Sequence, residues 1–290
     1  MTEAGWDDLK AMRWLVAVRA RILGYRYEEV SPDVLAIIEP DGQRHTVSLA
    51  PLSRAATALP RSEWTAAVDE FLTRTLAVDG DDAEDLDAIL PLLRTKLVPE
   101  EAAEQGSAVY GEFGQDLVEG LVVDRALTME WVTTERAERW SATEGRLLRR
   151  GRENVRAGGR LDVATEEVGG VRVTLLTGDD YASTHLFWLD EYGLVGEHGA
   201  LVSVPSRTSV LVAPIVAGTN GFAYLGAMAQ LTMVAYGEAR HPVMPRIYHW
   251  EPRMMDVMGQ VLGAALLQRS GDRMHVIVNP AFQESQEALV

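Results

Sequence analysis

The chain has 290 residues, 47% of them hydrophobic and 24% charged, which is the composition of an ordinary globular protein of one or two domains. It contains no cysteine, which excludes disulfides, thiolate zinc sites and cysteine nucleophiles. The formal net charge of -16 argues against general binding to DNA or RNA. Because the N-terminus is acidic and no apolar run approaches the ~20 residues of a membrane span, we expect a cytoplasmic protein that binds no membrane.

The first 78 residues predict a helix–hairpin–helix module. Apolar residues recur at helical spacing up to Leu23, and the alternating run VLAIIE follows the break at Pro32. The PDG at residues 40–42 predicts a turn before a returning strand. A second apolar stripe predicts the closing helix, and it consists of Trp64, Val68, Phe71, Leu72 and Leu76.

An acidic passage, DGDDAEDLDA, occupies residues 79–88 and carries six carboxylates. It lacks the glycine at position six and the glutamate at position twelve that a calcium loop starting at Asp79 or Asp81 requires. Like charges at this density repel one another, so we interpret the passage as an exposed linker. The predicted domains are therefore residues 1–78 and 89–290.

Residues 117–132 predict a strand pair or one long bent strand, and Thr134 or Ser141 can start a helix that runs through Asn154. Strands follow at residues 161–168 and 171–177, around a Gly-Gly pair typical of a two-residue hairpin loop.

Residues 146–156, RLLRRGRENVR, carry five arginines and one glutamate. They either contact an acidic partner or form a helix whose arginines lie in solvent. The second interpretation is favoured, because charge runs are usually solvated faces. Under it, Leu147, Leu148 and Val155 face the core.

Residues 182–192 predict a short helix, and residues 222–236 predict a nearly uncharged helix that we expect to be largely buried. Together with the N-terminal module, these elements predict an α+β fold. The second module is expected to contain an antiparallel sheet and packed helices.

The stretch GALVSVPSRTSVLVAPI, residues 199–215, is either two strands with a turn or a reactive serine loop. Pro205 presets the backbone for the second position of a type I turn, and Ser206 and Arg207 suit the positions after it. A serine nucleophile needs an activating base, and no candidate base is near in the sequence. The hairpin is therefore the prediction.

Several segments together resemble domain of unknown function 1444, the YtpQ-like family of bacterial proteins. They are ILPLLRTK, DLVEGLVVDRALTMEWVT, DDYASTHLF, SVPSRTSVLVA and GAMAQ, which lie between about residues 89 and 258. The N-terminal module is similar to the opening of that family and, more loosely, to secretion-chaperone-like modules. The resemblance implies no activity, because the family brings no established one.

Metal and cofactor motifs are absent from the sequence. None of the six histidines has the spacing of an HExxH or His-x-His site, and there is no phosphate loop, dinucleotide fingerprint or GxSxG elbow. We therefore expect no metal and no cofactor. The single alternative weighed is a mononuclear site formed by His185, Asp190, Glu191 and His198.

Asp179 and Asp180 precede a predicted helix, where an Asp-Asp step is typical of an N-cap. The alternative is an acid/base pair that serves a hydrolase or transferase together with His185. We favour the cap, because no catalytic motif accompanies the pair.

The sequence as a whole favours a protein-binding, chaperone-like or assembly protein over an enzyme, and the partner would be another protein or a second copy. A soft apolar cluster of methionines near the C-terminus either packs internally or presents an adaptable surface. The candidate binding residues are Val204, Arg207, Leu211, Met254, Met255 and Met258.

Overall fold

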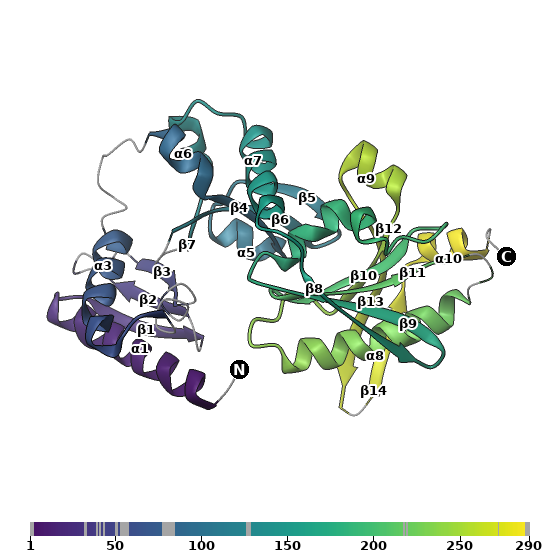
Figure 1. The fold of residues 1–290 in the computed structure, drawn as a ribbon, viewed down its shortest axis with the longest axis horizontal. Helices are drawn as coiled ribbons and strands as arrows, with labels where there is room; N and C mark the ends of the chain where they lie inside the picture. The colour runs from purple at the N-terminus through teal and green to yellow at the C-terminus, as the bar shows by residue number, and fades with distance from the viewer. Residues whose placement is uncertain are drawn as a thin grey trace. The chain divides into compact units, whose positions relative to one another are not determined.

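The computed structural model describes residues 3–31, 34–38, 40, 42, 44–49, 52, 58–76, 85–125, 129–216, 218, 220–271 and 273–287 (Figure 1). The chain forms two compact units. The first contains Met1–Leu92 and Val122–Glu130, and the second contains Leu93–Leu121 and Trp131–Val290. Most of the predicted acidic linker, up to residue 84, lies outside the described residues. The predicted domain boundaries therefore stay predictions.

The first unit contains a helix, a three-stranded antiparallel sheet and a second helix. These are α1 (Glu3–Ile22), β1 (Arg26–Ser31), β2 (Val34–Ile38), β3 (Arg44–Ser48), the 3-10 turn η1 (Arg61–Glu63) and α3 (Trp64–Leu76). The predicted hairpin is β2–β3, and β1 is an additional strand that pairs with β2. Apolar side chains from both helices and the sheet form one core, including Met12, Leu35 and Phe71. A short helix, α4 (Leu86–Ile89), begins after Asp85 and leads into η3 (Leu90–Leu92).

The larger sheet of the second unit has seven strands, and every neighbouring pair is antiparallel. Its order is β14-β13-β12-β10-β11-β9-β8. The strands are β8 (Asp162–Val168), β9 (Val171–Thr177), β10 (Ala200–Ser206), β11 (Ser209–Pro214), β12 (Arg246–Trp250), β13 (Leu262–Ser270) and β14 (Arg273–Val278). The predicted hairpin around Gly169 and Gly170 is confirmed, and both glycines have positive φ, which side chains disfavour.

The smaller sheet has the order β4-β6-β5, with β7 paired to β6. Its strands are β4 (Leu93–Pro99), β5 (Tyr110–Gly114), β6 (Leu117–Asp124) and β7 (Met129–Trp131), so the strand pair predicted for residues 117–132 is confirmed. The predicted single helix after it is two helices, α6 (Thr134–Arg139) and α7 (Glu144–Ala157). The chain breaks between them at Ser141, whose φ is +50°. The remaining helices are α5 (Glu100–Gln105), η4 (Ala182–Tyr192), α8 (Gly221–Glu238), α9 (Pro252–Met258) and α10 (Pro280–Glu287).

The central strands of the seven-stranded sheet are covered on both faces. Helix α8 lies across one face, as Figure 1 shows in green. Apolar residues of η4 and the smaller sheet pack against the other face. Val202 of β10 belongs to the η4 side and Leu201 to the α8 side, so this central strand is buried on both faces. The predicted α+β fold is confirmed, and none of the described helices is long and apolar enough to cross a membrane.

The predicted hairpin of residues 199–215 is present as β10–β11, but its turn lies two residues later than expected. Ser206 pairs with Ser209, so Arg207 and Thr208 form the turn. Pro205 lies inside β10, where the register shifts between Ser203 and Ser206. A proline has no N–H to donate, so a strand tolerates it at such an irregularity. The Pro205 carbonyl accepts a hydrogen bond from the Val243 N–H at 3.1 Å.

Candidate functional site

Helix α8 has an exposed outer side that is nearly uncharged. The side-chain oxygen of Asn220 caps the helix by accepting hydrogen bonds from the N–H groups of Phe222 and Ala223, at 3.1 and 3.3 Å. No charged residue then appears until Glu238. The side that faces the sheet is buried through Leu225, Ala227, Met228, Ala229 and Thr232.

The prediction that α8 is largely buried is wrong for its outer side. Phe222 is 66% exposed and Val234 is 51% exposed. The physical reason is that the sheet covers one side of the helix and no described element covers the other. A surface helix of a globular protein normally carries charged or polar residues on that side.

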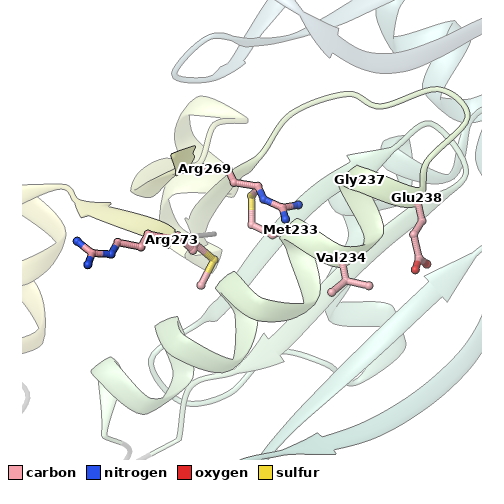
Figure 2. A pocket seen from close by; sticks show the side chains of 7 residues that line it. Met233, Val234, Gly237, Glu238, Arg269 and Arg273 are labelled. Carbon is pink, nitrogen blue, oxygen red and sulfur yellow. The ribbon is translucent and has the colours of Figure 1, made fainter. Parts of the chain in front are cut away.

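A hollow of about 450 Å³ adjoins this outer side, between the C-terminal end of α8 and the β13–β14 hairpin (Figure 2). The helix contributes Met233, Val234, Gly237 and Glu238, and the hairpin contributes Arg269, Arg273 and Met274. In Figure 2 the side chain of Arg269 extends toward Met233, whereas Arg273 points away from the helix. The lining thus combines apolar side chains with one carboxylate from the helix and two guanidinium groups from the hairpin.

The hairpin residues predicted to bind a partner lie mostly in the core. Val204 is fully buried and Leu211 is 4% exposed, so neither is available to a partner. They are buried because β10 and β11 are central strands of a sheet that is covered on both faces. Arg207 lies in the turn and is partly exposed.

The predicted methionine cluster divides between the two roles considered for it. Met255 packs against the apolar cluster beside η4, and Met254 is partly exposed. Met258 is 54% exposed at the end of α9, next to Val257, which is 84% exposed. One methionine of the cluster thus contributes to the core, and one is available on the surface.

The DDYASTHLF segment connects η4 to the open edge of β4. The Asp179 carboxylate accepts a hydrogen bond from the Tyr181 N–H at 2.9 Å, which is a turn contact just before η4. The predicted N-cap is not formed, because Tyr181 is the N-cap residue of η4 and no side chain caps this end. The Ser183 hydroxyl accepts from the Leu97 N–H at 2.9 Å, and the Thr184 hydroxyl donates to the Thr95 carbonyl. These two hydroxyl groups satisfy backbone groups of an edge strand that would otherwise lack partners. Asp180 is buried beside this segment.

His185 is buried at the centre of the same segment. Its Nδ1 accepts hydrogen bonds from the Trp188 indole at 3.2 Å and from the Tyr192 hydroxyl at 2.7 Å, which places the ring proton on Nε2. Burial lowers the pKa of His185 to about 4, against the opposing effect of the Asp179 charge. The lone pair that a general base would use is therefore already shared by two donors.

The residues of the alternative metal site do not converge. Glu191 pairs with Arg156, and the His198 carbonyl lies 2.8 Å from the ring nitrogen Nε2 of His249. Within the described ranges no group of three His, Asp or Glu side chains is placed to hold a metal ion.

The arginine-rich helix α7 is attached to η4 by its charged side. Leu147, Leu148 and Val155 are buried, as predicted. The expectation that the arginines lie in solvent holds for Arg156, which is exposed, but not for Arg152, which is partly buried. Both nevertheless have aromatic neighbours on η4. The guanidinium of Arg152 lies 4.1 Å from the centre of the Phe187 ring, and Arg156 lies 5.8 Å from that of Trp188.

Two further contacts extend this attachment. Beyond the end of α7, Arg160 stacks on Tyr192 at 4.5 Å. Arg152 also donates from Nε to the carboxylate of Glu119 at 2.7 Å. Glu119 is 1% exposed, and its burial raises the pKa of the carboxyl group although Arg152 opposes the shift. The spacing of the arginines in the sequence predicted an exposed stripe, but it did not reveal the aromatic residues of η4 as their partners.

No family model, curated protein or solved structure matches this chain. The candidate site therefore rests on the geometry of the chain itself. Of the two surfaces described, the outer side of α8 with its hollow is the exposed one, and the residues around His185 are the buried one.

Sequence reasoning missed Phe222, Val234 and the hairpin residues around the hollow. The signal for the hairpin is the Gly-Asp pair at residues 271–272 between two apolar runs. The exposure of Phe222 and Val234 has no such signal, because an uncharged helix has the same sequence pattern whether one of its sides or both are covered.

Proposed function

We propose that the protein is a protein-binding assembly protein that receives a partner on the outer side of α8. The observation that carries the proposal is an uncharged helix with Phe222 and Val234 more than half exposed. Each Å² of apolar surface left in water forgoes roughly 25 cal/mol of burial energy. Exposed apolar side chains on a helix side that carries no charge between Asn220 and Glu238 mark a candidate interaction site.

The hollow beside α8 supports the same proposal. Met233 and Val234 contribute apolar side chains, Glu238 lines the helix side, and Arg269 and Arg273 line the hairpin side. An apolar centre beside a polar rim is the usual anatomy of a protein interface, in which arginine is enriched. Two arginines and one glutamate give the hollow a net positive charge in a chain with a net charge of -16, which favours a partner segment that combines apolar and acidic side chains.

The hydrolase or transferase alternative, with Asp179, Asp180 and His185, has weaker support. The Asp179 carboxylate accepts a hydrogen bond from the Tyr181 N–H, and Nδ1 of His185 already accepts two hydrogen bonds. Activation of a water or hydroxyl would require one of these groups to abandon its present partner.

The proposal includes a cytoplasmic location and no nucleic-acid partner. The absence of cysteine suits a reducing compartment, and the acidic net charge disfavours phosphate backbones. The resemblance to the domain of unknown function 1444 family is part of the proposal, and it adds no activity to it.

Affinity capture from the native host tests the proposal. Wild-type bait is compared with Phe222→Asp and Val234→Asp baits, and Val257→Asp on α9 is the matched control because Val257 is also apolar and exposed. We expect the wild type and the control to retain a stoichiometric partner that both α8 variants lose. A partner retained equally by all four baits, or by none, would contradict the proposal.

A further inference from the structure

Strand β14 forms one open edge of the seven-stranded sheet, and its backbone orientation can be derived. β14 pairs with β13 in unbroken register from Ala265↔Val278 to Ser270↔Arg273. The Asn279 N–H donates to the Ala264 carbonyl at 2.8 Å, one step beyond that register. Because bonding alternates along an antiparallel pair, Arg273, His275 and Ile277 also turn their backbone groups toward β13.

The backbone N–H and C=O groups of Met274, Val276 and Val278 consequently point to the open edge. The neighbouring strand agrees with this assignment, because Leu267, which lies opposite Val276, donates its N–H to the Pro245 carbonyl and away from β14. Unpaired backbone groups on an edge strand are a template for another strand.

β14 lacks the features that usually protect such an edge. It contains no proline, its register with β13 has no bulge, and its charged residue is Arg273 at the first position. Met274 and Ile277 are 42% and 51% exposed, on opposite faces of the strand. Edge strands that remain monomeric normally carry charges, prolines or bulges.

The opposite edge of the same sheet differs. All side chains of β8 are exposed or partly exposed, and three of its seven residues are the carboxylates Asp162, Glu166 and Glu167. Pairing β8 with itself would bring six carboxylates together in a protein that is already acidic. The sheet therefore has one edge protected by charge and one edge without protection.

We propose that two copies of this chain pair through β14, antiparallel, about a two-fold axis at Val276. A two-fold axis perpendicular to a continuous sheet places one residue opposite its own copy, and centring it on Val276 aligns all three outward-facing residues. Val276 then lies opposite Val276 of the partner subunit, and Met274 lies opposite Val278 of the partner subunit. Each of these pairs exchanges two backbone hydrogen bonds.

The charges along the strand are compatible with this register. His275 lies opposite Ile277 of the partner subunit, and Arg273 lies opposite Asn279 of the partner subunit, so no cation faces a cation. No carboxylate occurs from Arg273 to Val278, so repulsion between the two acidic chains acts from outside the interface. Such repulsion is largely screened beyond about 8 Å at physiological salt.

The interface would be continuous with the apolar surface of α8. Val276 and Val278 pack against the cluster under α8, and Met274 lines the hollow beside it. The inference goes beyond the proposed function, because it names a second copy and holds whether or not α8 receives another protein.

Sedimentation equilibrium of the purified full chain tests the dimer. We expect twice the chain mass of 31.9 kDa for the wild type and loss of that dimer in Val276→Pro. Proline at this position removes an N–H that points to the open edge and no bond to β13, so the fold should persist. Val276→Lys is the second variant, because it places like charges opposite each other.

The matched control is Thr165→Pro on the β8 edge. The Gly178 N–H bonds to the Thr208 carbonyl on the β11 side of β9, so alternation turns the backbone groups of Thr165 outward as well. The control should remain dimeric. A monomeric wild type at every concentration, or a dimer that survives both Val276 variants, would overturn the inference.

Cysteine cross-linking tests the register, since the chain has no cysteine of its own. In the His275→Cys/Ile277→Cys double variant each thiol lies opposite a thiol of the other copy, at the Cα separation of about 4.5 Å of a non-hydrogen-bonded pair. We expect oxidation to give a covalent dimer, whereas each single variant, with its thiols two residues out of register, stays largely uncross-linked. Equal cross-linking of the singles and the double, or none in the double, would refute the register.

Failure of the inference is distinguishable from failure of the proposed function. A monomer that still loses a host partner on Phe222→Asp substitution would refute the dimer alone. A dimer whose host partners are unaffected by that substitution would refute the role of α8 alone.

Discussion

Helices α7 and α8 each cover one face of a sheet in the second unit, but their outer sides are opposites. The outer side of α7 is cationic, and Arg152 and Arg156 are held by carboxylates and aromatic rings. The outer side of α8 carries no charge before Glu238, and Phe222 and Val234 are more than half exposed on it. Arg152 and Arg156 thus have partners within the chain, whereas Phe222 and Val234 remain largely in solvent.

This difference distinguishes the charged side of α7, which stabilises the fold, from the outer side of α8, which is available to a partner. A guanidinium group that stacks on a ring and pairs with a buried carboxylate already interacts within the chain. Binding a partner through it would require breaking these interactions. An apolar helix side in water gains free energy from any partner that covers it. We therefore expect substitutions on the α7 side to act on stability and those on the outer side of α8 to act on binding.

The largest effect is expected beneath α8. Leu211 is 4% exposed in the cluster between the sheet and α8, so Leu211→Asp should unfold or aggregate the protein. An unpaired carboxylate there costs several kcal/mol against a total stability of roughly 5 to 15 kcal/mol. Thermal denaturation measures this, with Val257→Asp as the exposed control. A normally melting Leu211→Asp protein would show that the apolar cluster under α8 is not required.

The next effect is expected at the attachment of α7. Arg152→Ala leaves the buried carboxylate of Glu119 without its cation, which should cost about 2 to 4 kcal/mol, less than for a fully buried pair because Arg152 is partly exposed. Burial raises the pKa of Glu119, so the loss should shrink at acidic pH as the carboxyl group becomes neutral. Chemical denaturation at two pH values measures both effects. The Glu119→Gln/Arg152→Ala double variant should recover part of the loss, and no recovery would argue against an electrostatic cause.

A smaller effect is expected from His185 as the pH falls. The pKa of His185 is lowered to about 4 in the folded state, below its ordinary value of 6.5, so the unfolded chain binds the proton first. Stability should decrease from pH 6.5 toward pH 4 and lose no more from this group below that. His185→Gln, which cannot titrate, should show a shallower decrease in the unfolding free energy over this range. Identical pH profiles for the two proteins would contradict the assignment.

The smallest effects on stability are expected from substitutions at the hairpin tip and on the outer side of α8. Ser206 bonds to Ser209 at 2.6 Å near the turn, so Ser206→Ala should change stability by no more than ~1 kcal/mol and leave binding intact. A stable Ser206→Ala protein that has lost function would revive the reactive-serine interpretation.

Phe222→Ser should also leave the melting temperature nearly unchanged, since Phe222 is largely exposed, while it abolishes partner capture.

The sequence predicted most reliably the elements that residues adjacent in the chain determine. The Gly169-Gly170 pair located β8–β9, and the apolar runs on both sides of a polar dent located β10–β11, although Pro205 itself proved to be a strand irregularity rather than a turn residue.

Features that depend on distant partners were not predicted. The stacking of Arg152 on Phe187 joins residues of two helices, and nothing in either helix indicates the other. The exposure of Phe222 depends on how much of α8 the sheet covers, which helical periodicity does not report. Strand β14 was missed although a Gly-Asp pair precedes it, because its open edge becomes meaningful once the sheet order is known.

Site-specific photo-cross-linking in the native host tests the central claim most directly. A photoreactive residue placed at Phe222 is compared with one at Val257, because both positions are apolar and exposed, at 66% and 84%. The outer side of α8 as a docking surface predicts a discrete protein adduct from position 222 and none from position 257. Equal labelling at both positions, or no adduct at position 222, would contradict it.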